Sequence, residues 1–209
     1  LTNRGPDYNS YQIYNNIAIG HNRLSIIDID SRSNQPFIFN NLVLSFNGEI
    51  YNYIELRNYI IETYNETFNT NSDTEVIIKL FYYEKIEVAL NKLNGMFTIV
   101  LYNKNTNKLY VFRDRMGEKQ CYYYYTNDMF IIASNPGAIV KTLYDIDKKK
   151  WDLDMNSLYL YCSSGFLTSS NTLFKDIYSI KPGYYLEYCN HTLEIEKWWS
   201  PNLENQYIL

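Results

Sequence analysis

The stretch FNGEIYN, residues 46–52, decides how the middle of the chain folds. An Asn-Gly pair between apolar residues is the strongest short-range signal for a hairpin turn. In this chain a strand-like run, LVLSF (42–46), leads into the pair, and a helical pattern comes after it. The helical spacing is set by Tyr53, Leu56, Ile60 and Tyr64. The pattern therefore predicts that Asn47-Gly48 lies at the end of a strand that leads to a helix, and not in a hairpin.

The neighbouring segments predict mainly antiparallel strands. IAIG (17–20) has a strand-like pattern, and GMFTIVLYN (95–103) is apolar on both alternating faces. A run of the second kind is typical of a strand that is covered on both sides. After a polar turn, KLYVFRD (108–114) returns as a strand. Two further hairpins are predicted, QCYYYY with MFIIAS and GYYLEYC with TLEIEKWW.

Helices are predicted between these hairpins. SDTE (72–75) has the form of a capping box at the start of a helix, because Ser72 is followed three residues later by Glu75. A short helix is expected around 154–161, ending before Gly165. Since hairpins alternate irregularly with helices, the sequence predicts an α+β domain with two mainly antiparallel sheets and helices outside them.

The composition excludes several classes of protein. The 209 residues are enough for a sizeable core, and the net charge of −4 argues against a nucleic-acid partner. There is no membrane-length apolar run and no secretory signal, so no membrane partner is expected and the cytoplasm is the expected location. The three widely spaced cysteines form neither a disulfide framework nor a zinc pattern, and no metal is expected. Cys121 and Cys162 are expected to pack as small hydrophobes.

Four polar islands interrupt the apolar pattern: RGPD (4–7), RLSIID (23–28), NGE (47–49) and SDTE (72–75). Each lies next to a regular element, so all four can meet at one rim of the sheets. Guanidinium groups bind carboxylates by paired hydrogen bonds, and carboxylates bind ammonium groups. An Asn side chain and a Gly N–H can stabilise an oxyanion. The set is suited to a small zwitterion.

Six segments, in this order and spacing, resemble the glutamine-hydrolysing domain of glutamine-dependent asparagine synthetases: RGPD, GHNRLSIID, FNGEIYNYIELR, SDTEVI, LNGMFTIVLYN and RDRMGEKQCYY. IKPGYYLEY and KWW are similar to the end of that domain. The resemblance covers residues 1–199, and residues 200–209 are expected to begin a linker. It implies a type-2 glutamine amidotransferase domain with the N-terminal-nucleophile αββα sandwich.

The resemblance also implies a reaction. In the family, an N-terminal cysteine attacks the amide of glutamine, and a thioester and ammonia result. A C-terminal synthetase domain uses the ammonia, with ATP and Mg, to amidate aspartate. Glutamine and that domain are therefore the expected partners, and the amidotransferase domain itself needs no cofactor. A homodimer of the full enzyme is compatible with the resemblance.

The resemblance assigns a role to each residue that matches the family motifs. Arg23 would pair with the α-carboxylate of glutamine, and the backbone that follows would line the pocket. The residues of that backbone are Leu24, Ser25, Ile26 and Ile27. Glu49 and Asp73 would hold the α-ammonium.

The reacting amide is assigned to a second set of residues. Asn47 would donate its side-chain amide to the oxyanion, alongside the N–H of Gly48. Arg4 would lie near the nucleophile. These three residues are the predicted catalytic groups of the chain.

The sequence departs from the family pattern at its start. The family's nucleophilic cysteine precedes RGPD by a strand and a helix, and no residue of this sequence corresponds to it. The chain begins at Leu1, so it is expected to be truncated and inactive alone as a glutaminase. Asn3 also stands where the family has His, and ASNPG (133–137) where the family has Ala-Ser-Glu-x-Lys.

Plainer alternatives remain open. Asp73 is also a common helix N-cap residue. RDR (113–115) is interpreted first as a structural ion network and second as a set of substrate groups. His21 is expected to be buried and hydrogen-bonded, and His191 to lie in a turn. The functional alternative is a non-catalytic scaffold, or a glutamine-binding module, of a related ATP-dependent amide-forming enzyme.

Overall fold

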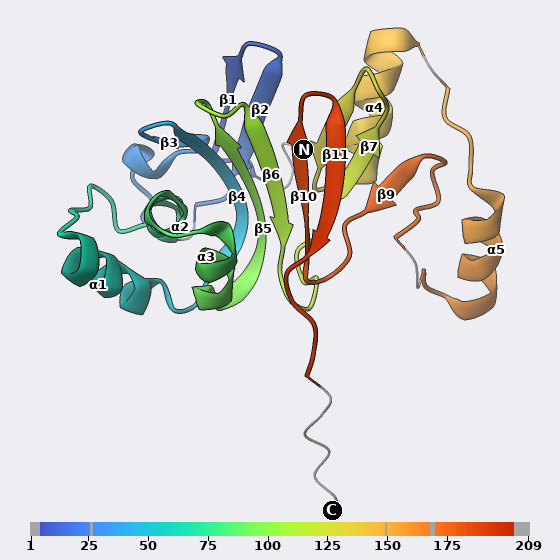
Figure 1. The fold of residues 1–209 in the computed structure, drawn as a ribbon. Coiled ribbons are helices and arrows are strands. Elements are labelled where there is room, and N and C mark those ends of the chain that lie inside the picture. Colours follow the sequence, from blue (N-terminus) through green and yellow to red (C-terminus); the bar gives the residue numbers. More distant parts are fainter. Residues whose placement is uncertain (1–4, 26, 149, 168–169, 203–209) are drawn as a thin grey trace, which may run out of the picture.

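A six-stranded antiparallel sheet runs through the middle of the molecule (Figure 1). The computed structural model describes residues 5–25, 27–148, 150–167 and 170–202. The strand order of the sheet is β11-β10-β6-β5-β4-β3. Its strands are β3 (Phe37–Phe39), β4 (Leu42–Ile50), β5 (Gly95–Asn103), β6 (Lys108–Arg113), β10 (Tyr184–Cys189) and β11 (Thr192–Lys197).

Three helices cover one face of this sheet (Figure 1). They are α1 (Tyr53–Tyr64), α2 (Asp73–Tyr83) and α3 (Ile86–Lys92). Most of α2 is buried, and its Ile77 and Leu80 pack with Leu44 of β4 and Phe97 of β5 in the main core. Burial of this kind stabilises the fold by about 1.5–3 kcal/mol for each large apolar side chain. The first turn of α2 is thereby fixed against β4.

The start of α2 confirms one half of the predicted capping box and corrects the other. Ser72 Oγ accepts the N–H of Thr74 at 3.0 Å, so Ser72 is the N-cap residue. Glu75 does not reach back to the N–H of Ser72, as a capping box requires. Its carboxylate instead accepts the N–H of Thr70 at 2.7 Å and pairs with Lys79 at 2.9 Å. Glu75 therefore bonds to the buried Lys79 and to Thr70, and not to the backbone of the N-cap residue.

The other face of the sheet is covered by a second layer in two separate pieces. A hairpin of β1 and β2 packs through Ile19 against Val43, and a three-stranded sheet in the order β8-β7-β9 lies beside it. Helix α4 packs on this smaller sheet through Ile139 and Leu143. These elements are β1 (Tyr8–Tyr14), β2 (Ile17–Arg23), β7 (Tyr122–Tyr125), β8 (Phe130–Ala133), α4 (Pro136–Asp147) and β9 (Ile177–Ser179). The architecture is the predicted αββα sandwich of antiparallel sheets.

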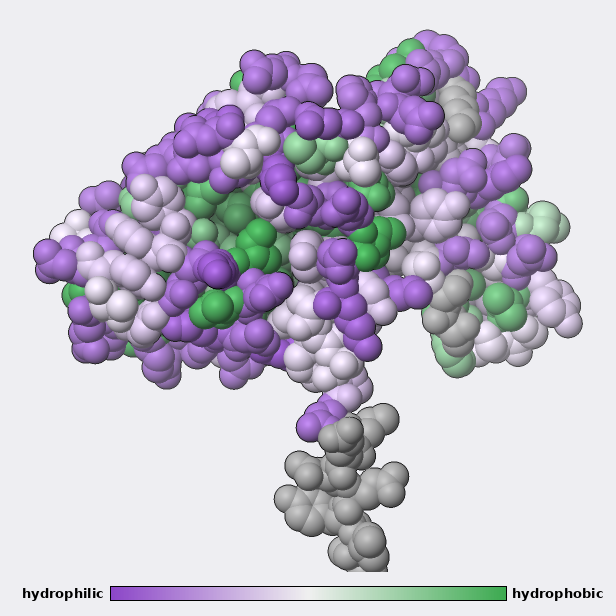
Figure 2. Space-filling view, in the orientation of Figure 1, coloured by the Kyte–Doolittle hydropathy of each residue, from purple (hydrophilic) through white to green (hydrophobic). Residues whose placement is uncertain are grey.

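Helix α5 (Met155–Ser164) stands away from the sandwich on a long connection (Figure 1). Asp154 accepts the N–H of Ser157 at 2.7 Å to start the helix, and Gly165 ends it with φ 78°. The helix predicted around 154–161 is thus confirmed. Figure 2 shows the surface hollowed between α5 and the segment that follows β11. Within the described ranges, no helix is both long and apolar enough to cross a membrane.

The Asn47-Gly48 pair lies inside β4, which continues to Ile50 before α1 begins at Tyr53. The prediction that the pair is not a hairpin turn is confirmed. The prediction that the strand ends at the pair is wrong, because β4 extends two residues beyond it. The strand continues because its backbone still pairs with β5 beyond the pair. The two strands approach closely at this point, since a Cβ at Gly48 would lie 2.0 Å from Met96 O. Only glycine fits there.

Candidate functional site

One edge of β4 is open beside the predicted oxyanion residues. β3 pairs with β4 only as far as Leu44, and no described strand lies on that side of β4 beyond this point. On the other side, Tyr51 donates its N–H to Asn94 O at 2.8 Å, which sets the alternation of hydrogen bonds along β4. The residues that direct their N–H and C=O groups toward the open edge are therefore Phe46, Gly48 and Ile50.

Side chains take the place of a neighbouring strand along this edge. The N–H of Phe46 donates to Gln35 Oε1 at 2.6 Å. Four residues further on, the N–H of Ile50 donates to Asp73 Oδ2 at 3.2 Å. The N–H of Gly48 lies between them and has no acceptor among the described residues. The edge thus presents an unused backbone donor at Gly48, flanked by two donors that are bonded.

His21 bonds to the same edge from β2. Its Nε2 lies 3.1 Å from Phe46 O, and because a carbonyl only accepts, this nitrogen carries the hydrogen. Burial lowers the pKa of His21 below its ordinary value, and the charge of Arg23 acts in the same direction. The ring is therefore neutral at pH 7. His21 is hydrogen-bonded as predicted, while its buried Nδ1 has no partner in the described part of the chain.

A cavity of about 270 Å³ lies in front of the open edge. It brings together three of the four polar islands, from β2 with the loop after it, from β4 and from the start of α2. The predicted site residues that line it are Arg23, Leu24, Ile27, Asn47, Gly48, Glu49 and Asp73. The predicted site residues, which span 50 positions from Arg23 to Asp73, thus meet in one pocket.

The pocket contains two carboxylates without a cation. Asp73 is 5% exposed, and burial raises its pKa above the ordinary value, with a further contribution from the negative charge of Glu49. Neither carboxylate forms an ion pair with any described residue. Ser72 caps α2, so Asp73 is free of that role. An ammonium group is the kind of ligand that two such carboxylates favour.

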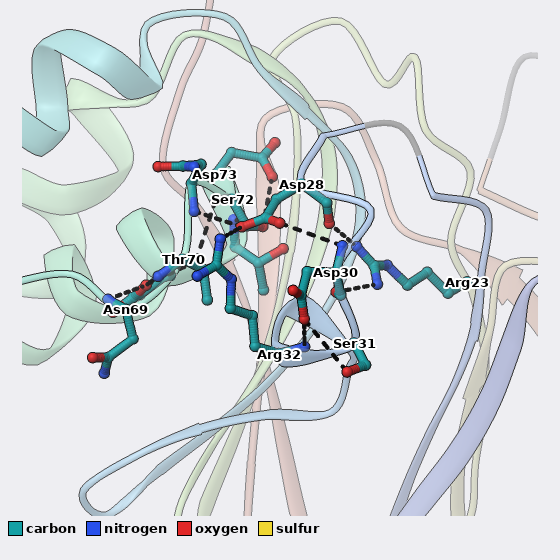
Figure 3. Close-up of polar contacts among 12 residues, drawn as sticks. Arg23, Asp28, Asp30, Ser31, Arg32, Asn69, Thr70, Ser72 and Asp73 are labelled. Atoms are coloured by element: carbon teal, nitrogen blue, oxygen red, sulfur yellow. Dashed lines mark hydrogen bonds and ion pairs between the residues drawn. The ribbon is translucent and has the colours of Figure 1, made fainter.

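Arg23 lies at the end of β2, is 6% exposed and holds the loop that follows (Figure 3). Its Nη1 donates to Asp30 O at 3.0 Å and to Asn34 Oδ1 at 2.8 Å, and its Nη2 donates to Asp28 O. A guanidinium has five N–H donors. The donor on Nε and the second donor on Nη2 have no acceptor among the described residues. Arg23 therefore anchors the loop, and two of its donors stay unused within the described part of the chain.

The same loop is tied to the segment before α2 (Figure 3). Asp28 Oδ2 accepts the N–H of Asn71 at 2.6 Å and lies 3.5 Å from Arg32 Nη2. Burial alone would raise the pKa of Asp28, but the hydrogen bonds that it accepts outweigh burial and lower it. Asp30 Oδ1 accepts the N–H of Arg32 at 3.0 Å and shapes the turn. These contacts fix β2 and α2 relative to each other.

The first polar island joins the others through Gly5 and Asp7. A Cβ at Gly5 would lie 2.2 Å from Asn22 O, so the chain passes β2 too closely for any other residue. The N–H of Asp7 donates to Arg23 O at 3.1 Å, and Asp7 Oδ2 accepts the N–H of Ser25 at 2.7 Å. Ser25 thus supports the loop and does not line the cavity. Two predicted site residues lie outside the described part of the chain: Arg4 and Ile26.

A second cavity, of about 610 Å³, lies between β2 and β8. β2 pairs with β1 and β8 with β7, so among the described strands each has one unpaired edge. Ser45 and Thr98, from β4 and β5, lie among the residues that line it. Asn47 and His21 line both cavities. A slot with a strand edge on each side has the form that accepts one additional strand.

The three cysteines lie outside the smaller cavity. Cys121 is buried as predicted, and burial raises the pKa of its thiol to about 12. Cys162 is exposed on α5, so the prediction that it packs as a small hydrophobe is wrong. Cys189 is half-buried on β10. None of the three lines the cavity in front of β4, and Cys121 lines the larger cavity beside it.

The RDR segment (113–115) has the predicted structural role, formed in a different way. Asp114 is buried, and its carboxylate accepts four backbone N–H groups, from Phe97, Met116, Glu118 and Lys119. Arg113 donates to three carbonyls, those of Gly117, Lys119 and Ile180. No ion pair links this segment to another described residue. The predicted ion network is in fact a set of side-chain hydrogen bonds to the backbone.

Gln35 and Lys119 also line the pocket. Lys119 belongs to RDRMGEKQCYY, one of the segments that resemble the family, so its position in that segment could have marked it as a candidate pocket residue. Gln35 stands before a proline outside any motif, and nothing in the sequence points to it.

His191 lies in a turn, as predicted. Across the described ranges, no group of three or more His, Cys, Asp or Glu residues is placed to hold a metal ion.

The fold is similar to those of solved amidotransferases. One is the glutamine phosphoribosylpyrophosphate amidotransferase of B. subtilis in complex with ADP and GMP, with a TM-score of 0.62, 21% identity and coverage of 88% of this chain and 35% of that one. Another is described as the allosteric regulatory enzyme of purine biosynthesis, with a TM-score of 0.63 and 21% identity. At this identity the likeness shows the fold, an N-terminal-nucleophile amidotransferase sandwich.

The chain belongs to the glutamine amidotransferase domain family, whose model matches residues 1–199. It is 38% identical over 185 residues to asparagine synthetase [glutamine-hydrolyzing] 1 of Bacillus subtilis strain 168, covering 88% of this chain and 28% of that protein. It is 30% identical over 220 residues to a putative asparagine synthetase [glutamine-hydrolyzing] 2 of Methanocaldococcus jannaschii, covering 95% and 41%. The chain thus spans less than half the length of these relatives, and the predicted family is confirmed.

Proposed function

We propose that this chain is the glutaminase domain of an asparagine synthetase-like amidotransferase. It would hydrolyse glutamine to glutamate and supply ammonia for the ATP-dependent amidation of aspartate. The observation that supports this most is the pocket in front of β4. There, two carboxylates that form no ion pair with any described residue line the same cavity as Arg23 and Gly48, which keep unused N–H donors in the described part of the chain. Each of these groups is complementary to one part of glutamine.

In this proposal the pocket binds glutamine at three points. The α-ammonium lies between Glu49 and Asp73, and the α-carboxylate accepts hydrogen bonds from Arg23. The side-chain amide then extends toward Asn47 and Gly48. As a nucleophile attacks the amide carbon, negative charge develops on its oxygen. The N–H groups of Asn47 and Gly48 would stabilise that charge, because they point at it without reorganisation.

The nucleophile would be the thiolate of an N-terminal cysteine carried by a strand. Laid in the slot between β2 and β8, such a strand would run beside Asn47, which lines both cavities. The thiolate forms a C–S bond to the amide carbon. The C–N bond then breaks, and ammonia leaves with a proton from the cysteine's own α-ammonium. Water hydrolyses the thioester to glutamate and restores the thiol.

The remaining parts of the proposal concern protein outside these 209 residues. ATP and Mg would be used by a synthetase domain, which would receive the ammonia, and the full enzyme would be a cytoplasmic homodimer. The names of the two relatives support the amidation of aspartate to asparagine. Residues 200–209 would then begin the linker to the synthetase domain.

The test is to extend the chain at its N-terminus with a strand that begins with cysteine, followed by a helix. We expect glutamate and ammonia to form from glutamine in equal amounts, and a matched variant with serine in place of the added cysteine to bind glutamine without hydrolysing it. If the extended chain folds and binds glutamine but releases no ammonia, the glutaminase role is wrong. If it folds and binds no glutamine, the pocket assignment fails as well.

The second candidate is a glutamine-binding module without catalysis. It is favoured by one observation, that all three cysteines lie away from the pocket and Cys121 has a pKa of about 12. Binding of glutamine by both the chain and its extended form, without hydrolysis by either, would support this module. A pure scaffold would bind no glutamine.

A further inference from the structure

Gln35 is the one buried amide side chain that joins two sides of the pocket in the described structure. It is 7% exposed. Its Oε1 accepts the N–H of Phe46 at 2.6 Å, and its Nε2 donates to Thr74 Oγ1 at 3.2 Å. One planar group therefore links β4 to the first turn of α2. Since the amide of Gln35 is rigid, the two hydrogen bonds fix the separation of the two elements.

The two partners of Gln35 are each one residue away from a site residue. Phe46 precedes Asn47 in β4, and Thr74 follows Asp73 in α2. In the proposed function Asn47 faces the reacting amide and Asp73 faces the α-ammonium. The covalent structure of glutamine limits the distance between these two ends, which is greatest when the side chain is extended. The pocket must therefore hold β4 and α2 at a matching distance.

The position of Gln35 is itself fixed independently of these two bonds. Its backbone carbonyl accepts a hydrogen bond from Ser10 Oγ on β1. The backbone of Gln35 is thereby anchored to β1, and its side chain extends to β4 and α2. Its buried hydrogen bonds are also costly to break, because the N–H of Phe46 would be left without a strand partner. The amide thus acts as a substitute for a missing strand at the edge of β4.

We propose that Gln35 is a positioning residue, whose side-chain amide sets the distance between the Asn47–Gly48 end of the pocket and Asp73. The consequence for glutamine rests on the proposed function, whereas the mechanical coupling of the two sides does not. Gln35 acts through Phe46 and Thr74, not through the reacting atoms.

The coupling is tested without any ligand, by amide NMR on the 209-residue chain. Thr74→Val removes the acceptor of Gln35 Nε2 while the cap at Ser72 remains. We expect the amide resonances of Phe46 and Gly48 to shift, because the freed side chain of Gln35 no longer holds Phe46 as firmly. Thr74→Ser keeps the hydroxyl and should leave them in place. If Thr74→Val leaves both resonances where they are, the two sides are not coupled through Gln35 and the proposal is overturned.

The effect on binding is tested by calorimetric titration with glutamine. Thr74→Val should weaken glutamine affinity by about tenfold, as expected for the loss of one buried hydrogen bond, and Gln35→Leu, which removes both hydrogen bonds of the amide, should weaken it by at least as much. Their effects should not add in the double variant, since both break the same link. Thr74→Ser keeps the hydroxyl and should bind glutamine with the affinity of the parent chain.

The control is Thr172→Val, which removes a buried hydroxyl that bonds Ile177 O at 2.9 Å and also bonds the backbone of Phe174, and which does not line the pocket. It should lower the unfolding midpoint as Thr74→Val does but leave glutamine affinity unchanged. Equal losses of affinity in both variants would mean that general destabilisation is responsible, and would overturn the proposal. If the parent chain binds no glutamine, the proposed function fails, while the amide shifts still decide whether Gln35 couples the two sides.

Discussion

The open edge of β4 and the turn after β6 are both built from arginine and aspartate, yet they differ in how far their hydrogen bonds are completed. In the turn, Asp114 accepts four backbone N–H groups, and Arg113 donates to three carbonyls. At the edge, Arg23 keeps two donors without an acceptor among the described residues, and Asp73 forms no ion pair with any of them.

Under the proposed function, this difference separates a structural polar cluster from a binding site. A buried polar group with complete hydrogen bonds adds to stability, whereas one with incomplete bonds costs free energy. The raised pKa of Asp73, caused chiefly by burial, is a sign of that cost. Such a cost is typical of a site that is completed by a ligand. Substitution of one group at a time in each region tests whether the turn contributes to stability and the edge to binding.

The largest effect is expected for Asp114→Ala. It leaves four backbone N–H groups without their acceptor, including that of Phe97 in β5, so the free energy of unfolding should fall by about 3–5 kcal/mol. Urea unfolding measures this. The control is Asp145→Ala, which removes an exposed partner of Lys141 and should cost less than about 0.5 kcal/mol. A loss below about 1 kcal/mol for Asp114→Ala would contradict the structural role.

The next effect is expected for Asn47→Ala in a chain extended with an N-terminal cysteine. Loss of one oxyanion donor should lower kcat by on the order of 10²–10³ and leave KM nearly unchanged, because the donor acts in the transition state. Steady-state release of ammonia gives both constants. An unchanged kcat would remove Asn47 from the oxyanion site.

Arg23→Ala should weaken glutamine binding by about 100-fold, since hydrogen bonds from a charged donor are the strong ones. Calorimetry below the unfolding temperature measures the affinity, because Arg23 also anchors the loop and its loss lowers stability. The control is Arg32→Ala, the half-exposed arginine of the same loop. If both variants bind glutamine equally well, Arg23 is structural and the contrast with Arg113 disappears.

The smallest effect is a pH dependence that comes from Asp73. Its pKa is raised, so it takes up a proton at a higher pH than an ordinary aspartate and then no longer attracts an ammonium. Glutamine affinity should therefore fall as the pH is lowered from neutral toward this raised pKa. Asp73→Asn should have low affinity without this pH dependence.

Stability is expected to change in the opposite direction over the same pH range. A group whose pKa is higher in the folded state than in the unfolded state binds its proton more tightly when folded. Protonation of Asp73 should thus stabilise the fold while it weakens binding. A parallel loss of stability and affinity on acidification would show that unfolding, not Asp73, is responsible.

Most of the core elements are predictable because their signals are local. The run 95–103 is apolar on both faces and forms β5, and α5 ends at Gly165 as expected. Short or exposed elements give no such signal: β1 is exposed along most of its length, and β3 and β9 have three residues each. α4 does carry a start signal, because Asn135 is followed by Pro136 at the start of the helix.

The residues of the pocket are predictable from their motifs, but the way in which they are held is not. Arg23, Asn47, Glu49 and Asp73 lie in separate islands whose types already suggest a zwitterion. The contact of Gln35 with Thr74 joins positions 39 residues apart. It depends on β3 ending early, which exposes the N–H of Phe46. That relation is a property of the three-dimensional sheet and has no pattern in the sequence.

The most direct test of the central claim is an amide NMR titration of the chain with glutamine at neutral pH. The account predicts saturable shifts of the Gly48 and Ile50 amides, with one glutamine per chain, and unmoved amides at Met116 and Glu118 in the turn after β6. Glutamine that leaves the Gly48 amide unchanged, or that moves the amides of the turn instead, would contradict the claim that the open edge of β4 is the binding site.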